Sequence, residues 1–431
     1  MDILDDLESE VRYYCRRWPA VFAHAQGSHL CDEHGTRYLD FFTGAGSLNY
    51  GHNPPLLIDA IIAYLRDNGV LNSLDMTTTA KRQFMLAFKS IILQPRTLTY
   101  RMQFVGPTGT DAVEAALRLA RKVTGKARVV SVSGGYHGMT LRSAQVSSMP
   151  GSRHLQRRSD VTFVPHEMDA PSPDLAFDAL QEAFNDAGTE VAALIIETVQ
   201  GEGGVRVSSD QYLRFAQKMC RSYNALLIVD DIQAGCGRTG TFFSFESSGI
   251  KPDIVCMSKS LSGAGLPLSM LLINPAMDQW EPGEHTGTFR GNNLAFVGGR
   301  AALEHWWSGG DPSERTDMLS AAFLSGLAEI AESCDWLGPP RGKGFMLGLP
   351  CPDAPTANLV SAAAFNHGLL VETCGRGEIV KLMPPLTVTE AELAQALDIL
   401  RLALAEVSGK RTPGGLCETL PEEVKADTGA E

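Results

Sequence analysis

Short, continuous apolar runs alternate with amphipathic segments through the middle of the chain. The runs read VAALIIETV, ALLIVDDI, DIVCMS and SMLLIN, and the amphipathic segments include ALRLARKVTG and YLRFAQKMCRSYN. Apolar runs without polar alternation are typical of strands that are buried on both faces, and a helix is usually longer. The pattern predicts an α/β fold with a mainly parallel sheet flanked by helices.

Domain boundaries follow from where this pattern begins and ends. It covers residues 58–308, which we predict to form a large domain, and SGGDPS interrupts it. The remaining expected elements are a helix in the first 25 residues, a hairpin in SHLCDEHGTRYLDFF, helices at 314–333 and 389–407, and strands near 343–349, 368–373 and 378–383. We predict that 1–57 and 309–409 form a smaller α+β domain, and that 410–431 is a flexible tail.

Charge and composition exclude several functional classes. The formal net charge of -13 argues against a nucleic-acid or anionic membrane partner. No apolar stretch approaches the roughly 20 residues that cross a bilayer, and the acidic N-terminus is unlike a signal peptide. The nine cysteines form no CxxC pair and the ten histidines no HExxH spacing, so we expect a cytoplasmic protein without a metal centre.

One lysine stands in an unusual place. Lys259 follows the apolar run that ends at Met257, and small residues and glycines come after it. Lysine is rare at the inner end of a buried strand, although a lone lysine in a loop is usually only solvated. The alternative is an amine that acts as a nucleophile.

Three further segments carry candidate binding groups. Gly109 and Thr110 directly precede an amphipathic helix whose N-terminus could hold an anion, although a plain capped helix would look similar. Tyr136 and His137 follow a predicted strand, where a tyrosine could also be simply packed. Asp230, Asp231 and Gln233 lie at the carboxyl end of another apolar run, where open α/β sheets bind ligands.

Together these groups match one cofactor. Pyridoxal 5'-phosphate requires an amine that can form a Schiff base, a carboxylate for its ring nitrogen, an aromatic side chain and a phosphate cradle. The sequence therefore predicts a pyridoxal-phosphate enzyme with Lys259 at its centre.

The chain resembles the class III (ω-amino acid) aminotransferases of the fold-type I pyridoxal-phosphate family. The motifs that carry the resemblance run in the family's order from residue 39 to 293 and continue to about 386: LDFFTGAGSLNYGHNPP, GPTGTDAVEAALRLAR, YHG, IIETVQGEGG, VDDIQAGCGRTG, SKSLSG, TGTFRGNN and KLMPPL. The resemblance implies a mainly parallel, seven-stranded-type sheet and a homodimer, or a dimer-based oligomer, with shared active sites.

The resemblance also implies roles for single residues. Lys259 would bind the cofactor covalently and carry the proton between the substrate carbon and the cofactor. Asp230 would face the ring nitrogen, Gln233 the phenolic oxygen, and Tyr136, next to His137, would stack on the ring. Gly109 and Thr110 would hold the phosphate with Thr288 of the neighbouring subunit, while Glu202 resembles a gate glutamate that selects the substrate end.

Within the class, the motifs most resemble the diaminobutyrate–2-oxoglutarate aminotransferases of ectoine biosynthesis. Met139 and Lys381 stand where ornithine-type members have arginines. With no arginine at 139, a carboxylate of glutamate would need another cation, and Arg290 is our candidate, although it could instead brace the dimer interface. Lys381 would pair with Glu202.

The resemblance implies amino transfer from glutamate to the terminal aldehyde of aspartate 4-semialdehyde, giving 2,4-diaminobutyrate and 2-oxoglutarate. Alternatives are another ω-amine, such as ornithine, 4-aminobutyrate or a secondary-metabolite amine, and racemisation or epimerisation with the same cofactor. A regulatory pyridoxal-binding domain would need an appended DNA-binding domain, which the short acidic N-terminal segment does not supply.

Overall fold

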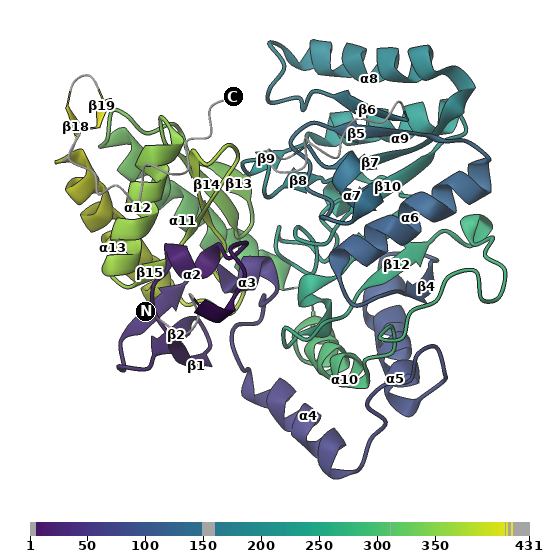
Figure 1. Ribbon diagram of the computed structural model, residues 1–431, viewed down its shortest axis with the longest axis horizontal. Helices are drawn as coiled ribbons and strands as arrows, with labels where there is room; N and C mark the ends of the chain where they lie inside the picture. The colour runs from purple at the N-terminus through teal and green to yellow at the C-terminus, as the bar shows by residue number, and fades with distance from the viewer. Residues whose placement is uncertain (1–5, 149–159, 311, 410, 413–414, 417–431) are drawn as a thin grey trace.

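A seven-stranded sheet forms the centre of the larger lobe (Figure 1). The computed structural model describes residues 6–148, 160–310, 312–409, 411–412 and 415–416. The strand order is β4-β12-β11-β10-β7-β5-β6, in which β12 runs antiparallel to both neighbours and the other pairs are parallel. The strands are β4 (Arg101–Phe104), β5 (Arg128–Val132), β6 (Val161–Val164), β7 (Val191–Ile196), β10 (Leu226–Asp230), β11 (Ile254–Met257) and β12 (Met270–Ile273). The predicted α/β sheet is confirmed.

Helices cover both faces of this sheet, as the unbroken apolar runs predicted. Along β10, Leu226 and Ile228 pack in one core with α6, while Leu227 and Val229 pack in the other core with α8 and α9. The helices of this lobe are α4 (Pro55–Arg66), α5 (Thr79–Ala87), α6 (Gly109–Thr124), α7 (Leu141–Val146), α8 (Pro173–Ala187), α9 (Asp210–Ser222) and α10 (Asn293–Ala302). Side-chain alternation therefore decides which residues at the end of β10 face α6.

The N-terminal and C-terminal segments lie together in the second lobe (Figure 1). Strand β15 pairs in parallel with β3, so a C-terminal strand completes an N-terminal sheet of order β1-β2-β3-β15. A second sheet has the order β13-β14-β17-β16. The strands are β1 (Phe22–Gln26), β2 (His29–Asp32), β3 (Arg37–Asp40), β13 (Arg341–Lys343), β14 (Met346–Pro350), β15 (Leu369–Leu370), β16 (Glu372–Cys374) and β17 (Ile379–Leu382).

Three long helices cover these sheets: α11 (Ser313–Glu332), α12 (Ala354–Asn366) and α13 (Glu390–Ser408). Thr389 caps α13 and forms the predicted capping box with Glu392. The hairpin expected in SHLCDEHGTRYLDFF is the antiparallel pair β2–β3. The domain limits at 57 and 308 remain a prediction, which this arrangement of sheets supports.

The expected long N-terminal helix is wrong within the residues that the structure describes. Apart from a short helical start at residues 6 and 7, the only helix there is α2 (Tyr14–Arg17), and β1 begins at Phe22. Trp18 is buried, with its ring stacked on Tyr14 and packed against Phe42. Tertiary packing of these rings, and the proline that follows, override the helical periodicity.

Most of the predicted tail, 410–431, lies outside the described residues. Within it, β18 (Arg411–Thr412) pairs with β19 (Gly415–Leu416).

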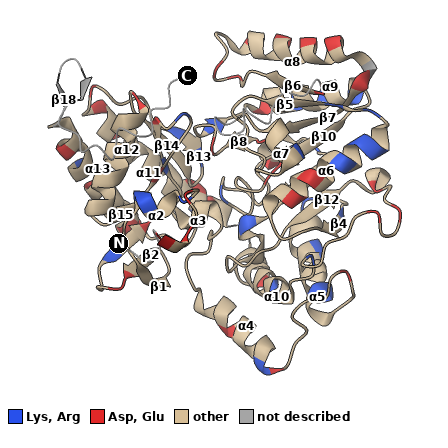
Figure 2. Cartoon of the chain, in the orientation of Figure 1, with Lys and Arg blue, Asp and Glu red and all other residues tan. Residues whose placement is uncertain are grey.

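Figure 2 shows acidic and basic residues spread over the chain, and the charged residues of α8 are all acidic. Among the residues that the structure describes, no helix is long and apolar enough to cross a membrane, and no group of His, Cys, Asp and Glu could hold a metal ion.

Candidate active site

Lys259 lies two residues after the end of β11 (Met257), at the start of a short 3-10 turn (Lys259–Ser262). Its φ of +48° costs a non-glycine residue on the order of 1 kcal/mol, and such strain is commonly found at active sites. The amine Nζ donates a hydrogen bond to the carbonyl oxygen of Ala45 at 2.8 Å. Burial lowers the pKa of Lys259, against the opposing effect of Glu202. A lowered pKa leaves more of the amine neutral and nucleophilic.

The carbonyl group that accepts this hydrogen bond belongs to an unusual turn. Residues Thr43–Gly46 form α3, and all four have positive φ. The turn is held in place because the Thr43 hydroxyl donates to the carbonyl oxygen of Met383 at 2.9 Å. The predicted motif GAGS therefore contributes a backbone oxygen to the site, which nothing in the sequence pattern indicated.

Asp230 is the last residue of β10 and shares the α6 side of the sheet with Leu226 and Ile228. Its Oδ2 lies 2.7 Å from Nδ1 of His137, and both side chains are buried. Burial lowers the pKa of His137, but the hydrogen bond and the charge of Asp230 outweigh it, so the pKa is raised above its ordinary value. The sequence placed these two residues in the site without predicting their contact.

Asp231, the next residue, contacts a different part of the protein. Its Oδ1 accepts a short hydrogen bond from the hydroxyl of Ser244, and the N–H of Ser244 lies 3.3 Å from each carboxylate oxygen. Burial raises the pKa of Asp231 to about 7. Asp230, rather than Asp231, therefore lines the cavity described next.

A cavity of about 280 Å³ brings most of the predicted residues together. Gly109 and Thr110 form the first turn of α6, whose backbone N–H groups lack intrahelical partners. A Cβ atom at Gly109 would lie 3.0 Å from Ile232, so glycine allows this close approach. The Thr110 hydroxyl is already hydrogen-bonded to Thr140 at 2.7 Å, so its backbone N–H is the group available for an anion.

An aromatic side chain and an unpredicted carboxylate also line the cavity. Tyr136 lines it while remaining 37% exposed, so part of its surface is uncovered. The Tyr136 N–H donates to Glu197 at 3.0 Å. Burial raises the pKa of Glu197 to about 7. Glu197 lies in the quoted motif IIETVQGEGG, but no feature of the motif distinguished it from a packed residue at the end of a strand.

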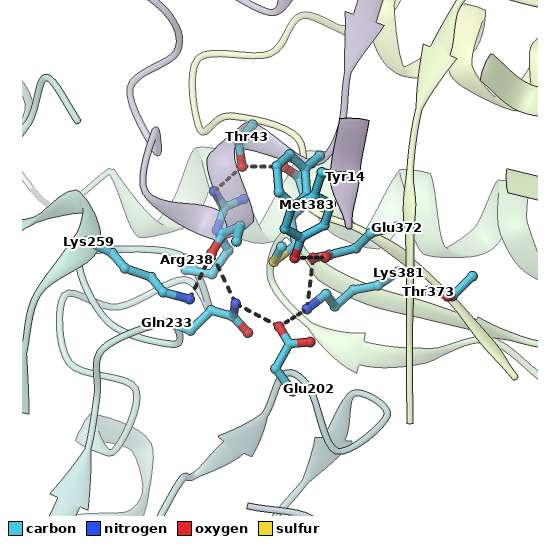
Figure 3. A network of polar contacts seen from close by, with 12 residues as sticks. Tyr14, Thr43, Glu202, Gln233, Arg238, Lys259, Glu372, Thr373, Lys381 and Met383 are labelled. Atoms are coloured by element: carbon cyan, nitrogen blue, oxygen red, sulfur yellow. Dashed lines mark hydrogen bonds and ion pairs between the residues drawn. The ribbon is translucent and has the colours of Figure 1, made fainter. Parts of the chain in front are cut away.

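A chain of polar contacts links Lys259 to the predicted gate (Figure 3). Gln233 donates through Nε2 to the carbonyl oxygen of Ala45 at 3.0 Å and to Glu202 at 3.3 Å. The amine of Lys381 lies 2.6 Å from the same oxygen of Glu202. The structure thus brings Glu202 and Lys381 together as predicted. Whether this pair moves as a gate stays a prediction.

Two members of this network were not predicted. Glu372 lies 2.9 Å from the amine of Lys381, and the hydroxyl of Tyr14 donates to Glu372 at 3.2 Å. Glu372 and Lys381 face each other across the β16–β17 pair. An acidic and a basic residue on neighbouring predicted strands were the available signal, but the register was needed to pair them.

Thr288 and Arg290 do not line the Lys259 cavity of the same chain. Thr288 lies on an exposed segment, beside Phe289, which is 65% exposed. Arg290 forms a short ion pair with Asp75 and lines a larger cavity, of about 960 Å³, that contains neither Lys259 nor Asp230. Their roles toward a neighbouring subunit remain predictions.

The residues around the cavity fit pyridoxal phosphate. The Oε1 atom of Gln233 is buried and accepts no hydrogen bond from the described residues, so a ligand group that donates a hydrogen bond would satisfy it. A helix N-terminus, the uncovered ring of Tyr136, the buried Asp230 carboxylate and the amine of Lys259 surround the same space. These are the groups that the cofactor needs.

Comparison with known proteins identifies the family, since the model for class III aminotransferases matches residues 14–404. The chain is a class III aminotransferase. A diaminobutyrate–2-oxoglutarate transaminase of Streptomyces anulatus is 48% identical, over 95% of this chain and 98% of its own. An uncharacterized aminotransferase of Sinorhizobium fredii is 47% identical, over 93% and 91%.

Solved aminotransferase structures share the fold. The ornithine aminotransferase of Toxoplasma gondii superimposes with a TM-score of 0.82 at 26% identity, covering 95% of each chain. Another structure of that enzyme, with pyridoxal phosphate partly occupying its active site, gives 0.81 at 25% identity, covering 94% of each chain. This aminotransferase is a fold-type I, pyridoxal-phosphate-dependent enzyme, as the sequence predicted.

Proposed function

We propose that this aminotransferase moves the amino group of glutamate to the terminal aldehyde of aspartate 4-semialdehyde. The products are 2-oxoglutarate and 2,4-diaminobutyrate. The observation that carries the proposal is the set of relatives named for this reaction, which are 44–48% identical over 93–95% of the chain. Ectoine biosynthesis is the pathway that the resemblance implies, and the free cysteines among the described residues support the proposed cytoplasmic location.

The chemistry that the cofactor supplies is an electron-accepting ring, which stabilises negative charge on the substrate carbon that bears the amine. Asp230, supported by His137, would keep the ring nitrogen protonated, and Gln233 would contact the phenolic oxygen. The first turn of α6 would bind the phosphate. Lys259 would hold the cofactor covalently and, once released, move the proton of the substrate carbon on its Nζ atom, for which its lowered pKa is suited.

Two different substrates must use this one site. Glutamate presents a carboxylate on the carbon that reacts, whereas aspartate 4-semialdehyde presents an aldehyde and carries its charged groups at the far end. Glu202 would pair with Lys381 while the aldehyde substrate is bound. It would swing away when the α-carboxylate of glutamate arrives and takes its place beside Lys381.

A homodimer would complete the site. Thr288 would complete the phosphate site of the other subunit, which agrees with its exposed position beside Phe289. Arg290 would bind the far carboxylate of glutamate or brace the interface. Its ion pair with Asp75 favours the bracing role.

The test is a substrate profile of the purified protein. Glutamate with aspartate 4-semialdehyde should give 2,4-diaminobutyrate at a higher kcat/KM than the same donor gives with the aldehydes of ornithine or 4-aminobutyrate. Preference for one of those aldehydes would make it the substrate instead. Loss of chirality from a single amino acid, without any keto-acid product, would indicate a racemase.

A further inference from the structure

The amine of Lys381 lies between two carboxylates. Its Nζ atom is 2.6 Å from Glu202 and 2.9 Å from Glu372 (Figure 3). Lys381 is completely buried and Glu372 is 2% exposed. One ammonium and two carboxylates give these three residues a formal net charge of -1. A pair of Glu202 and Lys381 alone would be neutral.

The second carboxylate is part of the framework of the protein. Glu372 and Lys381 are directly opposite residues of the antiparallel pair β16–β17, so the backbone register sets their contact. The Tyr14 hydroxyl donates to Oε2 of Glu372, and Lys381 faces Oε1. Oε2 therefore has a hydrogen-bond donor, whereas Oε1 has the Lys381 ammonium beside it without a hydrogen bond. Burial raises the pKa of Glu372, and the charge of Lys381 opposes that rise.

An excess negative charge in a buried cluster is costly unless a cation compensates for it. Among the three residues, Glu202 is the one that lines the Lys259 cavity, and its side chain is 23% exposed. Glu202 and Glu372 share the single ammonium of Lys381, which hydrogen-bonds to Glu202 and also lies 2.9 Å from Glu372. The charge of Glu202, which faces the cavity, is therefore only partly compensated.

We infer that Glu372 is a specificity-determining residue, which lets Glu202 bind the α-ammonium group at the far end of the substrate. The site would thus select ω-amines and ω-aldehydes that carry an α-ammonium group over those that lack one. This inference rests on the proposed function, because 2,4-diaminobutyrate and aspartate 4-semialdehyde both carry that group. When a substrate carboxylate replaces Glu202, Glu372 keeps Lys381 paired.

The test compares two amino donors that differ only in the α-ammonium group, 2,4-diaminobutyrate and 4-aminobutyrate, in single-turnover reactions of the holoenzyme. The unaltered enzyme should prefer 2,4-diaminobutyrate by more than about tenfold, as expected for a charged hydrogen bond. Glu372→Gln keeps the shape and removes the charge, and should lower that preference by about tenfold. Its half-reaction with glutamate should persist, which shows that the variant folds.

Two further variants separate charge from structure. Glu378→Gln removes a carboxylate from the turn of the same β16–β17 hairpin and should leave the preference unchanged. Tyr14→Phe removes the hydrogen bond to Glu372 but not its charge, and should change the preference by less than about threefold.

The outcomes also separate this inference from the proposed function. If the unaltered enzyme uses 2,4-diaminobutyrate poorly and another ω-amine well, the proposed function fails. If it uses 2,4-diaminobutyrate well but 4-aminobutyrate equally well, the inference fails, even where Glu372→Gln does not fold. An unchanged preference in an active Glu372→Gln enzyme also overturns the inference.

Discussion

Nδ1 of His137 lies 2.7 Å from Oδ2 of Asp230, and the N–H of Ile232 donates to Oδ1 of the same carboxylate at 3.2 Å. Asp230 is thus held between two donors at the edge of the cavity. The adjacent Asp231 instead accepts hydrogen bonds from Ser244. Two neighbouring buried carboxylates therefore make different contacts.

The first prediction contrasts these two carboxylates. Asp230→Ala should slow the half-reaction with glutamate by several orders of magnitude, because the ring nitrogen of the cofactor loses its anionic partner. Asp231→Asn should cost less than about tenfold, because Asp231 does not line the cavity. Stopped-flow spectra of the holoenzyme measure both rates. The reverse order would mean that the assignment of the two residues is wrong.

A second prediction concerns stability and pH. Burial raises the pKa of Asp231 from 3.8 to about 7. A raised pKa gives stability that is present below the unfolded-state value and is lost as the pH rises through the folded-state value. The cofactor-free protein should therefore lose stability as the pH rises from about 4 to about 7, and Asp231→Asn should reduce that loss. Urea unfolding at several pH values across this range tests this.

Glu197→Gln is a second variant for that experiment, because the pKa of Glu197 is also raised to about 7. Each variant should remove part of the pH dependence. An Asp231→Asn protein with the same pH profile as the unaltered chain would show that Asp231 stays ionised in the fold.

The third prediction concerns Lys259. Lys259→Ala should lose the covalent link to pyridoxal phosphate, which borohydride reduction followed by mass spectrometry detects, and essentially all turnover. Lys251→Ala changes an exposed lysine in the segment that precedes β11, and this variant should keep both the covalent link and turnover. An active Lys259→Ala enzyme would refute the assignment of the site.

Sequence periodicity predicted the sheet and its flanking helices, because buried runs, turn glycines and helix starts are local signals. The positions of Lys259, Asp230 and Tyr136 after predicted strands indicated them as candidates. The roles of Gln233, Glu202 and Lys381 came from the resemblance to class III aminotransferases. The positive φ values of Thr43–Gly46, which bring the Ala45 oxygen to Lys259, have no such signal. The Glu372–Lys381 contact depends on strand register, which the pattern of each strand alone does not fix.

A fourth prediction tests the shared site. If Thr288 serves the neighbouring subunit, Lys259→Ala and Thr288→Ala chains should complement each other after subunit exchange. A mixed dimer has one site with both residues intact, so random mixing restores about a quarter of the sites. Activity of the mixture should exceed that of either variant alone. No gain after proven exchange would place Thr288 in the site of its own chain.

The last prediction concerns the gate. Glu202→Ala removes the carboxylate that faces the cavity and pairs with Lys381, while Glu372 continues to pair with Lys381. The half-reaction with 2,4-diaminobutyrate should therefore fall by at least about tenfold more than the half-reaction with glutamate, whose own carboxylate can take the vacated place. Arg290→Ala should affect the glutamate half-reaction more, if Arg290 reaches the neighbouring site.

Lys381→Arg is the informative companion to Glu202→Ala. A guanidinium can hold a carboxylate with two hydrogen bonds, whereas the ammonium of Lys381 acts as a point charge. The arginine variant should therefore close the gate more firmly and slow the glutamate half-reaction, which requires Glu202 to leave. Single-turnover rates with each donor measure this directly. Equal losses in both half-reactions for both variants would mean that Glu202 and Lys381 only support the structure, and the gate hypothesis would be wrong.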